Sequence, residues 1–134
     1  MKKKIIISTG EVSGDLHGSL LSKALLEEAK KKSIDLEICG LGGERMKEEG
    51  VKILQDTTSI SAIGIWEALP LILPTILIQR RFYRMLKHYP PDCLILIDYM
   101  GPNIKIGTKL KKLQILPKRH IYQNSSRKKL YLRV

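Results

Sequence analysis

The sequence predicts a single α/β domain in which helices flank a parallel β-sheet. Short apolar runs alternate with stretches of helical periodicity, one run is apolar throughout, and polar or glycine-rich loops follow the runs. A continuous apolar run indicates a strand buried on both faces, which is typical of parallel sheets. Helical crossovers between such strands give a Rossmann-like arrangement. A chain of 134 residues is long enough for one such domain.

The expected elements follow one another along the chain. Strands are predicted where apolar residues cluster in short runs, and helices where they recur every three or four positions. The first predicted helix has lysines in its last turn. Its apolar residues recur at helical spacing: Leu16, Leu20, Leu21, Ala24, Leu25 and Ala29. The predicted strands cover residues 3–9, 36–41, 51–54 and 91–98, and the predicted helices cover residues 15–32, 42–50 and 103–114.

Three loops follow the carboxyl ends of these strands, where ligands of such sheets bind. They read TGEVSGD (9–15), GLGGERM (40–46) and DYMGPN (98–103). The glycines of the first loop fit neither the dinucleotide fingerprint nor the phosphate loop. Its carboxylates would repel a phosphate, whereas they accept hydrogen bonds from sugar hydroxyls, and one can act as a base. The alternative is that Ser13 or Asp15 merely caps the helix.

In the other two loops the residues of interest are Asp98 and the adjacent Gly42 and Gly43. Asp98 ends the predicted buried strand, where a carboxylate costs solvation free energy unless it has a partner. Catalysis and a structural role are both open for it. Gly42 and Gly43 permit a tight turn and close approach of the backbone.

The net charge of +11 is concentrated at the C-terminal end of the chain. Residues 1–98 hold 14 Lys and Arg against 13 Asp and Glu, whereas residues 99–134 hold 10 Lys and Arg and no acid. Weak, salt-dependent binding to polyanions is expected of such a tail, without specific recognition of nucleic acid. Cys39 and Cys93 form no CxxC motif and are expected to be buried thiols, and neither a metal site nor a cofactor is predicted.

An apolar segment bordered by cations precedes the last predicted strand. Between Trp66 and Ile78 there is only one charge, and arginines follow. This pattern suits contact with an anionic bilayer surface without crossing it, and burial against the sheet is the alternative for residues 66–77. The predicted membrane-contact residues are Trp66, Leu69, Leu71, Ile72, Leu73, Arg80 and Arg81. Beyond them, one helical face is expected to be core: Ile78, Phe82, Met85, Leu86 and Tyr89.

Four motifs in this order resemble the N-terminal part of lipid-A-disaccharide synthases, particularly the cyanobacterial type. They are ISTGEVSGDLHG, GLGGERMKEEG, SAIGIWEALP with LPTILIQRR, and PPDCLILIDYMGPN. The resemblance implies a metal-independent, inverting glycosyltransferase of GT-B architecture on the cytoplasmic face of the inner membrane. Such an enzyme joins UDP-2,3-diacylglucosamine to 2,3-diacylglucosamine 1-phosphate (lipid X) through a β-1,6 linkage and releases UDP.

The same resemblance implies roles for individual residues. Asp98 matches the strand-end aspartate proposed as general base in the family, with Glu11 as a second catalytic candidate. The expected substrate-binding residues are Gly10, Ser13, Gly14, Asp15, Gly43 and Asn103. Many relatives have APDFN after this aspartate where the chain has YMGPN, so a second carboxylate of the family has no counterpart here.

The resemblance covers residues 3–116, which are expected to form the acceptor-side domain. Residues 117–134 are expected to be a disordered or non-native basic tail, from a frameshift or a natural short variant. Because the family's UDP-binding domain is not expected in 134 residues, the chain alone is predicted to be inactive. The alternatives are a nucleotide-binding or regulatory module, or a non-catalytic fragment whose tail binds polyanions.

Overall fold

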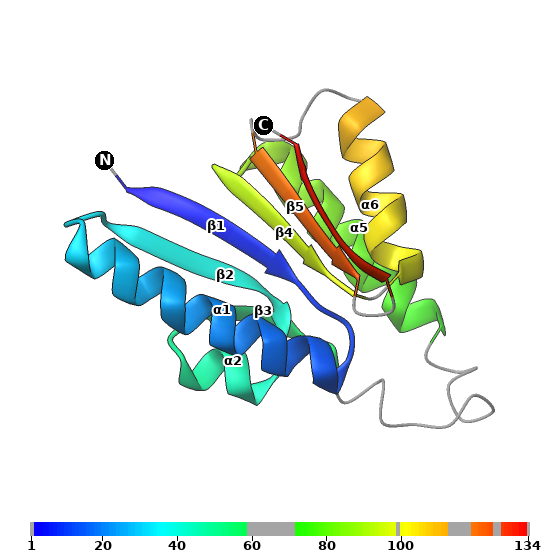
Figure 1. Cartoon of the computed structure of the whole chain (residues 1–134). Coiled ribbons are helices and arrows are strands. Elements are labelled where there is room, and N and C mark those ends of the chain that lie inside the picture. The colour runs from blue at the N-terminus through cyan, green and yellow to red at the C-terminus, as the bar shows by residue number, and fades with distance from the viewer. Residues whose placement is uncertain (1, 59–71, 99, 113–118, 125–126, 134) are drawn as a thin grey trace.

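The computed structural model is an α/β fold built on a six-stranded sheet of order β3-β2-β1-β4-β5-β6 (Figure 1). It describes residues 2–58, 72–98, 100–112, 119–124 and 127–133. Neighbouring strands are parallel from β3 to β5, and β6 is antiparallel to β5. The elements are β1 (Lys3–Ser8), α1 (Val12–Lys31), β2 (Leu36–Gly42), α2 (Glu44–Glu48), β3 (Lys52–Asp56), α5 (Ile72–His88), β4 (Cys93–Ile97), α6 (Met100–Lys112), β5 (Arg119–Asn124) and β6 (Arg127–Arg133). The predicted fold class is confirmed.

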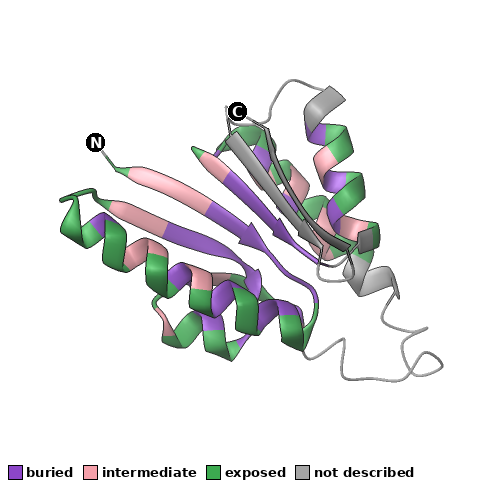
Figure 2. Ribbon diagram, viewed as in Figure 1, coloured by how far each residue is buried: buried purple, intermediate pink, exposed green. Residues whose placement is uncertain are grey.

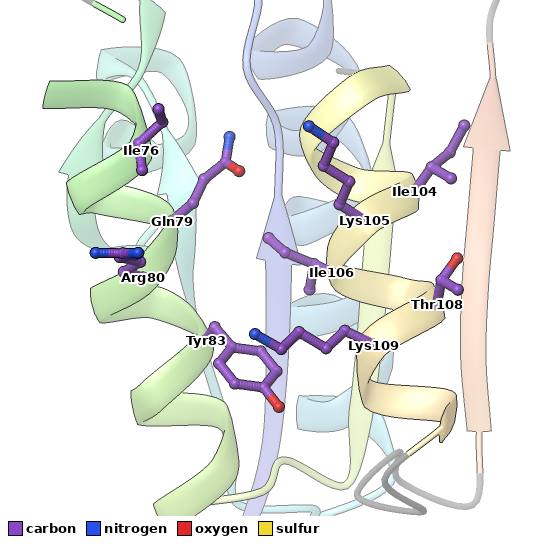
Figure 3. A pocket seen from close by; sticks show the side chains of 9 residues that line it. All are labelled: Ile76, Gln79, Arg80, Tyr83, Ile104, Lys105, Ile106, Thr108 and Lys109. Carbon is purple, nitrogen blue, oxygen red and sulfur yellow. The ribbon is translucent and has the colours of Figure 1, made fainter. Parts of the chain in front are cut away.

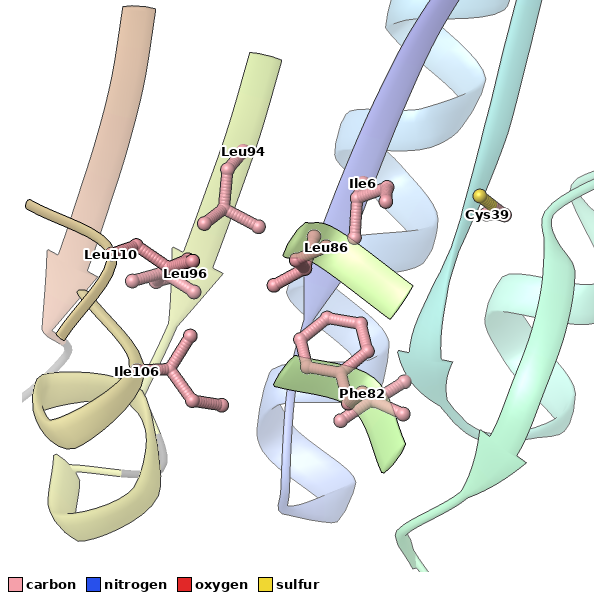
Figure 4. Packing of buried hydrophobic residues seen from close by; sticks show 9 residues of the cluster. Ile6, Cys39, Phe82, Leu86, Leu94, Leu96, Ile106 and Leu110 are labelled. Atoms are coloured by element: carbon pink, nitrogen blue, oxygen red, sulfur yellow. The ribbon is translucent and has the colours of Figure 1, made fainter. Parts of the chain in front are cut away.

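Alternate residues of the central strands pack against opposite layers of helices. On β1, Ile6 belongs to the cluster covered by α5 and α6, whereas Ile7 belongs to the cluster covered by α1 and α2. Figure 4 shows Phe82 and Leu86 of α5 facing the same side of the sheet as Ile6. This period of two is what a strand buried on both faces requires, and Figure 2 shows the resulting buried stripe along β1, β2 and β4.

Helix α1 packs through small residues together with part of its set of regularly spaced apolar residues. Leu16 is exposed and Leu20 is 59% exposed, whereas Gly18 and Ser22 are buried. A Cβ on Gly18 would lie 2.6 Å from the sulfur of Met46 in α2, so a larger residue there would displace the Met46 side chain. Of the apolar residues at helical spacing, Ala29 is buried, and Leu21 and Leu25 pack against the cluster that contains Ile7.

Helix α5 begins at Ile72, two residues before Pro74, and so contains a proline in its first turn. A proline is tolerated in the first turn because the N–H groups there have no partner within the helix. The predicted core face is confirmed for Phe82 and Leu86, which are buried, with Ile78 and Met85 packed against them. Tyr89 is the exception, since it follows the helix and is 69% exposed.

The basic C-terminal segment contributes two strands to the sheet. Tyr122 of β5 pairs with Leu96 of β4, and Tyr131 of β6 pairs with Tyr122. The expectation that residues 117–134 are disordered is therefore wrong for β5 and β6. An apolar strand such as β4 would otherwise present an open edge, and pairing with the tail satisfies its backbone groups.

Neither cysteine forms a disulfide, and the predicted burial is confirmed for Cys39. Cys39 is buried on β2, and Cys93 at the start of β4 is partly buried. Burial raises the pKa of the Cys39 thiol, so this side chain is neutral and unreactive at physiological pH.

Candidate functional site

The candidate site lies at the carboxyl ends of β1 and β4, which are neighbours in the sheet. From β1 the chain proceeds to β2 on one side, and later returns to β4 on the other. Ser8 at the end of β1 pairs with Leu96 near the end of β4. The loops that follow these strands diverge toward opposite faces, and such a switch point is where parallel sheets form a ligand crevice. The strands that precede Glu11 and Asp98 are therefore neighbours.

Asp98 immediately follows β4 and is buried at the carboxyl end of this strand, with an unusual backbone conformation. Its φ angle is +47°, in the left-handed region that residues with a Cβ rarely adopt. The carbonyl oxygen of Asp98 accepts a hydrogen bond of 2.9 Å from Nδ2 of Asn103. The strand end and the first turn of α6 thus fix the direction in which residue 98 leaves the sheet.

Asn103 joins the ends of β1 and β4 through all the polar atoms of its side chain. Its Oδ1 accepts a bond of 2.8 Å from the hydroxyl of Ser8, and its Nδ2 also donates to the carbonyl oxygens of Ser8 and Ile97, at 3.2 and 3.3 Å. The side chain is 0% exposed. These contacts hold the two strand ends together and give Asn103 a positioning role.

Asp15 lies in the first turn of α1, on the other side of β1 from Asp98, and its carboxylate caps α2. Its Oδ1 accepts hydrogen bonds from the backbone N–H groups of Gly43 and Met46, at 2.7 and 3.2 Å. Its Oδ2 accepts one from the N–H of Arg45 at 3.2 Å. These are N-terminal amides of α2, whose dipole favours a negative charge. Asp15 is only 3% exposed, and through these hydrogen bonds its carboxylate holds the loop after β2 in place.

Gly42 and Gly43 are required by this packing. A Cβ on Gly42 would overlap the sulfur of Met46, and a Cβ on Gly43 would lie 2.9 Å from Oδ2 of Asp15. Gly14 makes a similar approach, since its Cβ would lie 3.1 Å from Cβ of Thr9. The predicted close approach of backbone is confirmed, and at Gly42 and Gly43 it serves contacts within the protein.

The remaining predicted residues lie in the loop after β1 and in the first turn of α1. Glu11 is the N-cap residue of α1 and makes no side-chain capping bond. Glu11 and Ser13 are exposed at the edge of the sheet, whereas Gly10 and Gly14 are buried. The interpretation that Ser13 or Asp15 caps α1 is wrong, because α1 begins before both of them and Asp15 caps α2.

Two buried threonines that the sequence analysis did not single out complete the framework of the site. The hydroxyl of Thr9 donates to the carbonyl oxygen of Leu41 at 3.2 Å, and the hydroxyl of Thr57 donates to the carbonyl oxygen of Thr9 at 2.9 Å. They join the residues that follow β1 and β3 to one another and to the end of β2. Their position, each directly after a strand, is the signal that would have identified them.

The predicted membrane-contact residues fall partly outside the described part of the chain. Trp66, Leu69 and Leu71 are not among the described residues, and Ile72 and Leu73 lie in the first turn of α5. Arg80 and Arg81 are exposed on α5. Among the described helices, none combines the length and apolarity needed to cross a bilayer.

Comparison with known proteins gives relatives of one kind. The family model described as "Lipid-A-disaccharide synthetase" matches residues 5–123. A lipid-A-disaccharide synthase from Prochlorococcus marinus is 53% identical over 109 residues, covering 81% of the chain and 28% of the relative. Relatives from Gloeothece citriformis and Coxiella burnetii are 54% and 32% identical, over 81% and 84% of the chain and 28% and 29% of their own lengths. The chain thus spans less than a third of each.

A solved structure supports the fold independently. The C-terminal domain of the PF1911 hydrogenase from Pyrococcus furiosus superposes with a TM-score of 0.59 at 14% identity, covering 90% of both chains. That likeness concerns the α/β fold alone. The family match continues through residue 123, beyond the boundary at residue 116 drawn from the motifs, and so includes most of β5. Because the family model matches residues 5–123 and a relative is 53% identical over 109 residues, the chain belongs to the lipid-A-disaccharide synthase family.

Proposed function

We propose that this chain forms the acceptor-side domain of a lipid-A-disaccharide synthase and that Asp98 is its general base. The observation that carries the residue assignment is the left-handed backbone of Asp98 at the end of β4. Such a conformation costs free energy at a residue with a Cβ, and it is characteristic of positions where a site requires one side-chain direction. The position next to β1, at the switch point of the sheet, supports the same assignment.

In the proposed reaction, the carboxylate of Asp98 accepts the proton of the 6-hydroxyl of lipid X. The hydroxyl oxygen attacks the anomeric carbon of UDP-2,3-diacylglucosamine from the face opposite the leaving group. A carbon–oxygen bond forms to the acceptor, and the bond to the diphosphate breaks with its electron pair leaving on UDP. Positioning and general-base catalysis are the two contributions for which this chain has candidate groups.

The surrounding residues divide into positioning and contact roles. Ser8 and Asn103 fix the backbone at Asp98, and Asp15 fixes the loop that contains Gly43. We assign substrate contact to the exposed Glu11 and Ser13, with the backbone of Gly10, Gly14 and Gly43 forming the wall of the crevice. Glu11 is the second candidate for the base.

The other half of the proposed enzyme is a UDP-binding domain of the GT-B type, contributed by sequence outside these 134 residues. Because the chain spans 28% of its Prochlorococcus relative, we expect no disaccharide from the chain alone. A nucleotide-binding module would instead bind UDP directly, and calorimetry with UDP and ATP distinguishes the two. Micromolar affinity lost in Gly14→Val would contradict the proposed division of labour.

We place the enzyme on the cytoplasmic face of the inner membrane, held by the segment from Trp66 to Arg81. The exposure of Arg80 and Arg81 on α5 supports this placement. The 134-residue chain is expected to sediment with anionic vesicles even at about 0.5 M salt, where screening confines charge attraction to a few Å. Replacing Leu71 and Ile72 by serine should release it. Loss of wild-type sedimentation at this salt concentration would assign the binding to charge alone, and retention of the double variant would exclude Leu71 and Ile72 from the contact.

The base assignment is tested in a chimera in which residues 5–112 replace the matching part of the Prochlorococcus relative. With UDP-2,3-diacylglucosamine and labelled lipid X, the chimera should form disaccharide. Asp98→Asn should lower kcat by at least about a hundredfold with little change in KM, because an asparagine occupies the same space but accepts no proton. Glu11→Gln is the matched control. If Glu11→Gln loses as much kcat and Asp98→Asn does not, the base is Glu11.

A further inference from the structure

We propose that an exposed apolar ridge on α1 is the surface on which the donor-binding domain of the same enzyme docks. The α1 ridge consists of Val12, Leu16 and Leu20, which are 47%, 41% and 59% exposed. Because these residues are spaced four apart, they lie one above the other on a single face of the helix. The inference rests on the proposed function, since it requires a donor-binding domain, but it does not depend on which carboxylate is the base.

The half of α1 that carries the ridge has almost no exposed charge. From Val12 to Ser22 the helix contains one Asp and no Glu, Lys or Arg, and that carboxylate, Asp15, is buried. The other half of the helix is rich in charge, with Lys23, Glu27, Glu28, Lys30 and Lys31. Exposed apolar side chains on a surface depleted of charge are typical of the centre of a protein–protein contact.

The exposed apolar surface between α5 and α6 has a different character. There, on the opposite face of the sheet, Ile76 and Ile104 lie beside Arg80, Lys105 and Lys109 (Figure 3). Cations of this kind would lose hydration under an apolar protein surface, which costs free energy. The α1 ridge has no Lys or Arg beside it within its half of the helix, so another domain can cover it without that cost.

The α1 ridge adjoins the crevice between β1 and β4, and this position identifies the partner. Val12 follows Glu11, the exposed N-cap residue of α1, and Leu20 lies about 12 Å further along the helix. The first turn of α1 also approaches the end of β4, because a Cβ on Gly14 would lie 3.8 Å from the carbonyl oxygen of Ile97. A domain that brings the sugar donor to this crevice therefore comes to lie beside the first turns of α1, and ligand sites form preferentially between domains.

The relatives are long enough to contain such a domain. The chain covers 28% of its Prochlorococcus relative, so most residues of that relative lie outside the matched part. Interfaces between domains of one chain commonly bury about 600–1,500 Å². An interface of this size that begins at the crevice would cover the α1 ridge together with the residues around it.

The first test compares the 134-residue chain with the chimera described above. Leu16→Cys and Leu20→Cys are made separately, and their reaction with a water-soluble thiol reagent is followed after subtraction of the rate of the unsubstituted protein. Both thiols should react at least about tenfold more slowly in the chimera, because a docked domain exposes them only when it opens. Ile34→Cys is the matched control. Ile34 is 44% exposed beyond the far end of α1, and a thiol there should react at the same rate in both proteins.

The second test asks whether the ridge matters only when the other domain is present. Leu16→Ser with Leu20→Ser should shift the Tm of the 134-residue chain by no more than about 2 °C, because both side chains are exposed. In the chimera the same pair should raise KM for UDP-2,3-diacylglucosamine at least about tenfold, because weaker docking lowers the fraction of enzyme that is closed around the donor. Ile34→Ser should change this KM less than twofold. Circular dichroism verifies that each variant is folded.

Several outcomes would overturn the proposal. Equal thiol reactivity in the chain and the chimera would show that nothing docks on the ridge, and an unchanged KM in the double variant would show that docking does not depend on it. Protection that appears in the chain alone as its concentration rises would assign the ridge to a second copy. Protected thiols in an inactive chimera would support docking and contradict the glycosyltransferase assignment, whereas reactive thiols in an active chimera would contradict docking alone.

Discussion

Asp15 and Asp98 are two buried carboxylates on either side of β1, yet the structure treats them in opposite ways. Asp15 sits within α1 and accepts three backbone hydrogen bonds from the start of α2. Asp98 follows β4 with its backbone in a left-handed conformation, and Asn103 holds its carbonyl group. The first residue stabilises its surroundings, whereas the second is held in place by them.

This difference teaches how to separate structural from chemical carboxylates at the edge of a parallel sheet. Burial does not distinguish them, because both side chains are buried. The hydrogen bonds that Asp15 accepts and the backbone conformation of Asp98 do distinguish them. A carboxylate that satisfies helix N–H groups contributes to stability, whereas one on a strained backbone is maintained at a cost. Substitutions at the two sites should therefore affect stability differently.

The largest effect is expected for Asp15→Ala. Loss of the carboxylate leaves three N–H groups of the α2 loop without their acceptor, two of them buried, and should lower the free energy of unfolding by about 3 kcal/mol. Urea denaturation measures it. Glu11→Ala removes the exposed carboxylate at the N-cap of α1 and should change the free energy of unfolding by no more than about 0.5 kcal/mol. Equal effects would show that Asp15 does not hold the loop.

Asn103→Ala should be the next most damaging change. It removes the hydrogen bonds that join β1 to β4 and leaves buried carbonyl groups of Ser8 and Ile97 unsatisfied, at an expected cost of about 2 kcal/mol. Thr108→Ala, on the exposed surface of α6, is the control. Amide exchange should also accelerate at the ends of β1 and β4. A protein as stable as the control would mean that the strand ends are held without Asn103.

At position 98 the comparison concerns glycine and alanine. Both substitutions remove the carboxylate, but only alanine retains a Cβ on a backbone with positive φ. Asp98→Gly should therefore be more stable than Asp98→Ala by about 1 kcal/mol, the reverse of the usual order within regular structure. The same pair at Asp15, within α1, should favour alanine. If alanine is preferred at both positions, the backbone of residue 98 is not strained in solution.

The smallest effect concerns a carboxylate at the opposite end of the strands. The backbone N–H of Lys4 and the ammonium of Lys3 lower the pKa of Asp92. A lowered pKa in the folded state contributes stability above the unfolded pKa, and this stability is lost as the pH falls through the folded value. The stability difference between the wild type and Asp92→Asn should shrink from about pH 6 to about pH 3. A constant difference would exclude this linkage.

The sequence was most informative where the chemistry is local. Apolar runs located β1, β2 and β4, and the rule that ligands gather at strand ends singled out Asp98. Partners that lie far apart in sequence were not predictable: nothing near Asp15 indicates that it caps a helix beginning at Glu44. The close approach of Gly18 in α1 to Met46 in α2 was unpredictable for the same reason.

The position of β1 in the sheet has a consequence for how the chain folds. Ile7 pairs with Gly40 on one side and with Ile95 on the other. The first contact forms across one helical crossover, whereas the second must wait until β4, which ends at Ile97, has also left the ribosome. Loop-closure entropy makes such distant pairing slow. During that delay the apolar edge of β1 is open to other chains, so the interval before β4 docks is the period in which a nascent chain is most exposed to aggregation.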